Sequence, residues 1–111
     1  MDSLKDFIRE TLREKMYEAT VVMRSDRGEN LTIVTDNLRG VCGITVVTVL
    51  EPAQPVSETV EQVKLRVKFF ISHATLKLHL KKMAAEARNI SGIFSFQVLN
   101  VSSVQNRIYS K

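Results

Sequence analysis

The residues most able to do chemistry are one cysteine and two histidines. Cys42 lies in an apolar stretch with no base close to it in the sequence. A lone cysteine of this kind is typically a small buried hydrophobe, because a reactive thiol needs a neighbouring base or positive charge. His73 and His79 lie six residues apart, which does not place two metal ligands on one helical face as a four-residue step does. The sequence therefore predicts a protein that is not an enzyme, with no metal site and no cofactor.

A polar loop from Ser25 to Asn30 is the best candidate for binding a small ligand. It precedes a predicted helix, whose N-terminal amides would suit a carboxylate. The loop resembles the first strand-to-helix turn of ACT domains, ferredoxin-like regulatory modules in which an Asp-Arg-Pro-Gly-x-Leu-type turn often binds an amino acid. The resemblance implies that Asp26, Gly28 and Asn30 face such a ligand. A turn that needs Gly28 only for a positive φ explains the same residues without a ligand.

Hydrophobic periodicity defines the elements that position these residues. It predicts helices over 2–15, 31–41 and 72–89, strands over 16–24, 44–50, 59–71 and 93–101, and a polar tail over 102–111. Asn30 is the expected N-cap of the second helix, and Gly40 and Gly43 are expected at its end. The segment 51–58 carries both prolines and is predicted to be a turn, while the strand before it is expected to be mostly buried.

The order of these elements predicts an α+β fold. A helix over 1–15 precedes a domain over 16–101 with the order βαββαβ, which is that of a ferredoxin-like sandwich. Right-handed crossovers would place the two later helices on one face of a four-stranded antiparallel sheet. The opposite face would then be bare.

The bare face of the predicted sheet is the best candidate for an interface with another protein. The alternation of the 59–71 strand puts Lys64, Arg66 and Lys68 on it, and the first strand adds Val22. From the second strand either Val47 and Val49 or the alternate set would lie there. The amphipathic N-terminal helix adds Leu4, Phe7 and Ile8. We therefore expect a homo-oligomer or a protein partner that uses this face and this helix.

Composition limits the other classes of partner. The chain has 111 residues, 44% hydrophobic and 25% charged, with a formal net charge of +4, which indicates one ordinary globular domain. The basic residues divide between the sheet face and the helix layer, and the bare face lacks the paired aromatic residues of RNA-recognition domains, so nucleic acid is not the expected partner. No apolar run is long enough to span a membrane, and we expect a cytoplasmic protein.

The N-terminus carries a second resemblance. The segment Ser3 to Glu10 resembles the start of small virion and prohead proteins of T-even-type tailed phages. Such proteins often carry sites for a prohead protease that cuts after Ile/Leu-x-Glu, and Ile8-Arg9-Glu10 and Leu12-Arg13-Glu14 both fit that pattern. The resemblance implies a virion-associated assembly protein whose mature chain begins at Thr11 or Lys15.

Overall fold

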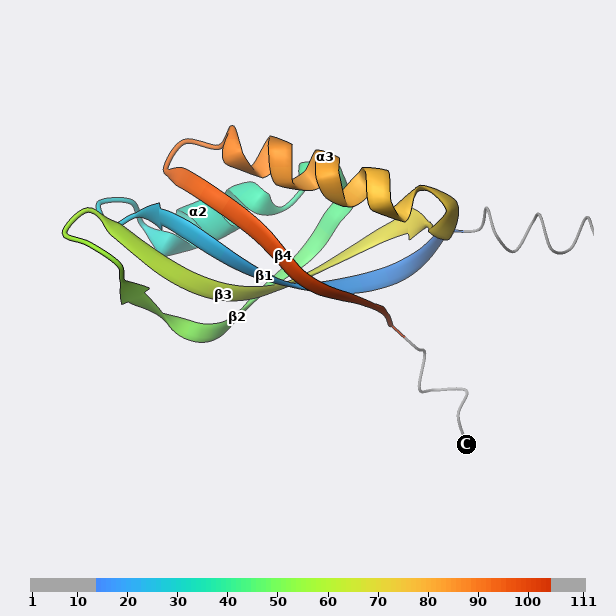
Figure 1. Ribbon diagram of the computed structural model, residues 1–111, viewed down its shortest axis with the longest axis horizontal. Coiled ribbons are helices and arrows are strands. Elements are labelled where there is room, and N and C mark those ends of the chain that lie inside the picture. Colours follow the sequence, from blue (N-terminus) through green and yellow to red (C-terminus); the bar gives the residue numbers. More distant parts are fainter. Residues whose placement is uncertain (1–13, 105–111) are drawn as a thin grey trace, which may run out of the picture.

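The computed structural model describes residues 14–104 as one four-stranded antiparallel sheet with two α-helices over one face (Figure 1). In chain order the elements are β1 (Glu14–Asp26), α2 (Leu31–Leu38), β2 (Ile44–Pro55), β3 (Val60–Ser72), α3 (Leu76–Arg88) and β4 (Ile93–Ser103). Short 3-10 turns occupy Val41–Gly43 and His73–Thr75. The strand order is β2-β3-β1-β4, so β1 and β3 are central and the other two strands form the edges.

The core lies between the two central strands and the helices. Alternate residues of β1 and β3 are buried, and the register places Val21 directly opposite Leu65. The buried members are Tyr17, Ala19, Val21, Met23 and Ser25 of β1 and Val63, Leu65, Val67 and Phe69 of β3. This set confirms the predicted two-residue alternation of both strands, because successive side chains of a strand point to opposite faces of the sheet.

Both helices bury the predicted stripes. Val34 and Leu38 of α2 and Met83 and Ala87 of α3 are buried against the sheet. The Asn30 side chain caps α2 by accepting a hydrogen bond from the Thr32 amide at 2.9 Å, as predicted. Gly40 follows the end of α2 with a φ of 91°, a left-handed conformation that glycine adopts without steric cost.

β2 is an exposed edge strand rather than the buried strand predicted over 44–50. Only Ile44 is buried in it, while Val46 and Val49 are 39% and 46% exposed. The strand also continues through Pro52 to Pro55, where we predicted a turn. Both prolines are tolerated because an edge strand has one side without a hydrogen-bonded neighbour.

β4 contains two irregularities in its pairing with β1. The register shifts once between Arg24 and Ser25 and once between Thr20 and Val21, which leaves Phe94 and Leu99 as extra residues in β4. Each is a β-bulge, where two residues of one strand oppose one residue of its neighbour. Phe94 and Leu99 are consequently half-exposed, at 55% and 48%.

The architecture corrects the predicted ferredoxin-like sandwich preceded by a helix. The described chain begins with a strand, and its sheet has the order β2-β3-β1-β4 with two helices, so it is a strand-rich α+β domain. Residues 14 and 15, predicted to end the first helix, belong to β1 because Glu14 pairs with Ser72 and Lys15 with Ile71. Pairing with β3 overrides the local helical periodicity there. Ser102 and Ser103, predicted as tail, extend β4; the rest of the predicted N-terminal helix and tail lies outside the described residues, apart from Val104.

Candidate functional site

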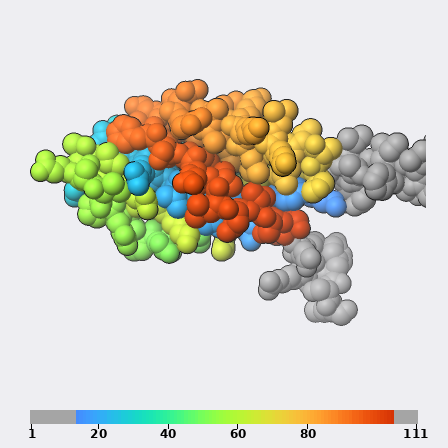
Figure 2. Space-filling model, in the orientation of Figure 1, coloured from blue at the N-terminus to red at the C-terminus, as the bar shows by residue number. Residues whose placement is uncertain are grey.

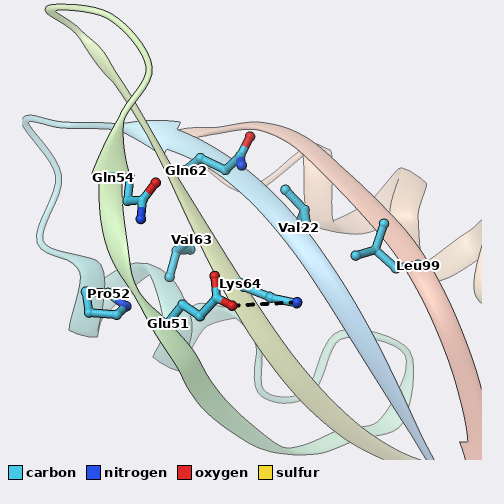
Figure 3. Close-up of a pocket in the computed structure, with 8 residues that line it drawn as sticks. All are labelled: Val22, Glu51, Pro52, Gln54, Gln62, Val63, Lys64 and Leu99. Atoms are coloured by element: carbon cyan, nitrogen blue, oxygen red, sulfur yellow. Dashed lines mark ion pairs between the residues drawn. The ribbon is translucent and has the colours of Figure 1, made fainter.

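The face of the sheet opposite the helices is uncovered in the described part of the chain; we call it the open face (Figure 1). Its side chains alternate with those of the core. They include Glu18, Val22 and Arg24 of β1, Gln62, Lys64, Arg66, Lys68 and Phe70 of β3, and Val46, Thr48, Glu51 and Gln54 of β2. Leu99 of β4 points the same way beside Val22 (Figure 3). Phe94 and Ser95 together oppose Arg24 at a bulge, so Phe94 lies on the side of Arg24 and away from the buried Ile93.

Four large apolar side chains on the open face are exposed to solvent. Val46 is 39% exposed, Phe70 47%, Leu99 48% and Phe94 55%. They come from three different strands, β2, β3 and β4. Single exposed hydrophobic residues are ordinary on protein surfaces, but several on one face of a sheet are typical of a surface that contacts another protein.

The charges on the open face are partly paired with one another. Lys64 Nζ lies 3.7 Å from Glu51 Oε1, and Arg66 Nε lies 4.0 Å from Glu18 Oε2. Arg24 donates a hydrogen bond from Nε to Gln62 Oε1 at 3.1 Å. Lys68 has no ion-pair partner among residues 14–104. The open face therefore retains a positive charge from Arg24 and Lys68.

A shallow hollow lies on the open face between the β2–β3 hairpin and the strands β1 and β4 (Figure 3). Its volume is about 220 Å³, and it is lined by Val22, Glu51, Pro52, Gln54, Gln62, Val63, Lys64 and Leu99. Pockets for small ligands usually measure roughly 300–1,000 Å³ and enclose most of the ligand. Glu51 and Lys64, which form an ion pair, are both among the lining residues (Figure 3), and the hollow is smaller than such a pocket, so we treat it as part of the open face.

The predicted interface residues separate into three groups. Val22, Lys64, Arg66 and Lys68 lie on the open face as expected. Val47 does not, because it lies opposite the buried Val67 and packs against the core, and Val49 lies opposite the buried Leu65. The alternate residues of β2, Val46 and Thr48, occupy the open face instead. Leu4, Phe7 and Ile8 lie outside the described residues.

The polar loop between β1 and α2 is held by local hydrogen bonds. Asp26 Oδ1 accepts from the Gly28 amide at 2.9 Å, and Asn30 Oδ1 accepts from the Thr32 amide at 2.9 Å. Gly28 is not among the glycines with a positive φ, so that expectation was wrong. Each of the two predicted ligand-facing side chains thus already has a backbone partner. Nothing in this geometry favours a ligand at the loop.

The loop is also tied to two distant segments. The Arg27 amide donates to the Thr59 carbonyl at 2.9 Å, and the Arg27 guanidinium donates to the Ser57 carbonyl at 3.2 Å. The Asp26 amide donates to the Gly92 carbonyl at 2.8 Å. The loop therefore connects the β2–β3 turn with the α3–β4 turn at one end of the domain.

The Cys42 side chain forms a hydrogen bond with a residue that the sequence analysis did not identify. It is half-buried in the 3-10 turn, at a φ of 46°, and its thiol donates to Glu86 Oε2 of α3 at 3.0 Å. Burial, followed by the hydrogen bond and the negative charge of Glu86, raises the pKa of the Cys42 thiol from 9.0 to about 11. The thiol is therefore protonated and unreactive at neutral pH, as expected of a structural cysteine.

The two histidines belong to the packing around the buried aromatic rings. His73 Nδ1 lies 2.9 Å from the Tyr17 hydroxyl, and the His79 ring stacks on Phe69 with centroids 5.4 Å apart. Within residues 14–104 no three histidine, cysteine or acidic side chains are grouped as metal ligands would be. None of the helices described there is long and apolar enough to cross a membrane.

Comparison with known proteins assigns the chain to no family. No protein-family model matches it, and a search of the curated proteins finds no match either.

Proposed function

We propose that this chain is a non-enzymatic association module that binds a second copy of itself or another protein through the open face. The observation that carries the proposal is the exposure of four large apolar side chains, Val46, Phe70, Phe94 and Leu99, on a sheet face that no described element covers. Burying such a surface removes apolar area from water, which drives most protein association.

The charges of the open face indicate the chemistry of the partner. Exposed ion pairs such as Glu51–Lys64 contribute little to stability, so they serve mainly to keep the face soluble while it is unoccupied. Arg24 and Lys68 remain to meet carboxylates on the partner. Electrostatic complementarity of this kind raises the rate of association and selects the partner more than it raises affinity. A partner other than a second copy is therefore expected to present an apolar surface with acidic residues around it.

Substituting Phe70 tests the proposal. Phe70→Asp replaces an exposed aromatic side chain of the open face with a charge and should weaken self-association, or binding to an isolated partner, by about tenfold or more, as expected when an aromatic residue of an interface is lost. Ile33→Asp is the matched control, because Ile33 is 56% exposed and lies on α2, away from the open face. Sedimentation velocity over a range of concentrations measures self-association.

Two results would contradict the proposal. Equal affinities for wild type, Phe70→Asp and Ile33→Asp would show that the open face makes no contact. A stronger effect of Ile33→Asp would move the interface to the helix layer. Urea unfolding of both variants verifies that each remains folded, which is expected because both side chains are half-exposed.

A further inference from the structure

We propose that β4 pairs with β4 of a second copy of this chain, so that two four-stranded sheets form one antiparallel sheet of eight strands. This inference concerns the edge of the sheet, whereas the proposed function concerns its open face. It rests on the composition of β4 and on the positions of its two bulges. Figure 2 shows β4 lying uncovered along the surface beneath α3.

The two edges of the sheet differ in how they are protected against pairing. Both edge strands have register shifts in their pairing, but only β2 also carries Glu51 and two prolines, features that prevent another strand from adding to an edge. β4 has eleven residues, Ile93–Ser103, and contains no charged residue, proline or glycine. A long uncharged edge strand exposes unpaired backbone groups that can accept another strand. The unprotected edge is therefore β4.

The bulges of β4 are placed symmetrically about Gln97. The first involves Phe94 and Ser95 and the second Leu99 and Asn100, so each pair lies two to three residues from Gln97. When a strand pairs with a copy of itself in antiparallel orientation, a two-fold axis relates the two, and each residue meets its mirror position. With the axis at Gln97, Phe96 faces Val98 and Ile93 faces Val101.

In this register the two residues of each pair lie on the same face of the sheet. Ile93 and Phe96 are buried on the helix side, and Val98 and Val101 pack against the same core. On the open face Phe94 would lie opposite Asn100, and Ser95 opposite Leu99. A shift of the axis by half a residue would set core side chains against open-face side chains, because one-residue slips move a side chain to the other face. The symmetric placement of the bulges thus allows a second copy of this strand to match the two faces along the whole of β4.

Self-pairing also brings no like charges together, since β4 carries none. It would cover part of Phe94 and Leu99, which are 55% and 48% exposed. The open faces of the two copies would become one continuous surface twice as wide. The apolar residues of the proposed interaction face would then lie on both sides of the two-fold axis.

Cross-linking at the axis tests the register. In a Cys42→Ser background, Gln97→Cys would place the two introduced thiols directly opposite each other, with Cα atoms about 4.5–5.5 Å apart, within the range that a disulfide spans. Asn100→Cys is the matched control, because the two copies of position 100 would lie about 20 Å apart along the strands. Both side chains are exposed, so both variants should fold.

Mild oxidation should convert most of Gln97→Cys to a covalent dimer and leave Asn100→Cys monomeric, as seen by non-reducing electrophoresis. Equal cross-linking of the two variants, or none in either, would overturn the proposal. Charge provides a second measurement. Gln97→Lys and Gln97→Glu should each dimerise up to about fivefold more weakly than wild type, and their equimolar mixture should recover dimer in sedimentation.

The two proposals fail separately. If Phe70→Asp abolishes association while Gln97→Cys does not cross-link, the open face is the interface and the β4 pairing is wrong. If Gln97→Cys cross-links and Phe70→Asp changes nothing, the edge pairs and the open face has no demonstrated role. A wild-type chain that stays monomeric at millimolar concentration would overturn the β4 pairing directly.

Discussion

Substituting Gly92 tests whether the α3–β4 turn packs closely against the loop between β1 and α2. It lies in the α3–β4 turn with a φ of 89°, and its carbonyl accepts the hydrogen bond from the Asp26 amide. A Cβ atom at this position would lie 2.8 Å from Glu29 Cγ, closer than real side chains approach. Gly92→Ala therefore carries two separate costs, one from the backbone conformation and one from the contact with Glu29.

The two costs can be separated by comparison with Gly40. A left-handed backbone costs an L-residue about 1–2 kcal/mol, and moving the exposed Glu29 side chain off its rotamer costs about 0.5–1.5 kcal/mol. Gly40 has a similar φ of 91° but no atom within 4 Å of its Cβ position. We expect Gly40→Ala to lose about 1–2 kcal/mol and Gly92→Ala to lose about 1 kcal/mol more.

Urea unfolding followed by far-UV circular dichroism measures both losses, with unchanged slopes indicating an unchanged extent of unfolding. The Gly92→Ala/Glu29→Ala double variant should recover the contact part and match Gly40→Ala, while Glu29→Ala alone should change stability by less than about 0.5 kcal/mol. If Gly92→Ala costs no more than Gly40→Ala, the close packing of the two turns is refuted. If the double variant recovers nothing, the extra cost has another origin.

Two further predictions concern Asn30 and Cys42, whose side chains each form one hydrogen bond described above. Asn30→Ala removes the N-cap of α2 and should lower the free energy of unfolding by about 1 kcal/mol, whereas Asn30→Asp, which keeps the acceptor oxygen, should lose much less; equal losses would show that the cap contributes nothing. Folding raises the pKa of the Cys42 thiol from 9.0 to about 11, so the protonated thiol stabilises the folded state. This stabilisation is complete below pH 9 and is lost as the pH rises toward 11. The difference in unfolding free energy between wild type and Cys42→Ser, measured by urea titration, should therefore shrink between pH 9 and pH 11. Glu86→Gln should speed alkylation of Cys42 at pH 9, because it removes a group that raises the thiol pKa. A difference that does not change with pH would contradict a raised thiol pKa in the folded state.

Local patterns in the sequence predicted the parts of the fold that obey one period. The alternation of β1 and β3 and the stripes of α2 and α3 were confirmed because an inward-facing side chain recurs every two residues in a strand and every three to four in a helix. The Asn30 cap was also predictable, since its partner lies only two residues away. The exposure of β2 was not predictable, because an apolar strand looks the same whether a helix covers it or not.

The candidate site was predicted in outline only. Val22, Lys64, Arg66 and Lys68 were correctly placed on the open face because the strands that carry them are regular. For the second strand the sequence left two alternating sets open, and Val47 and Val49 were named as interface candidates; the structure places the other set, Val46 and Thr48, on the open face. The irregular pairing of β2 decides between the sets, and bulges leave no reliable mark in a sequence.

The sequence by itself determined the α+β class and the two strands, β1 and β3, that bury one side and expose basic residues on the other. Only the tertiary structure decided that Phe94 and Leu99 emerge on the open face, that the thiol of Cys42 meets Glu86, and that β4 is the less protected edge. The reason is physical. Periodicity depends on neighbours along the chain, whereas bulges, edges and hydrogen bonds between segments 44 residues apart depend on which strands pair and what the helices leave uncovered.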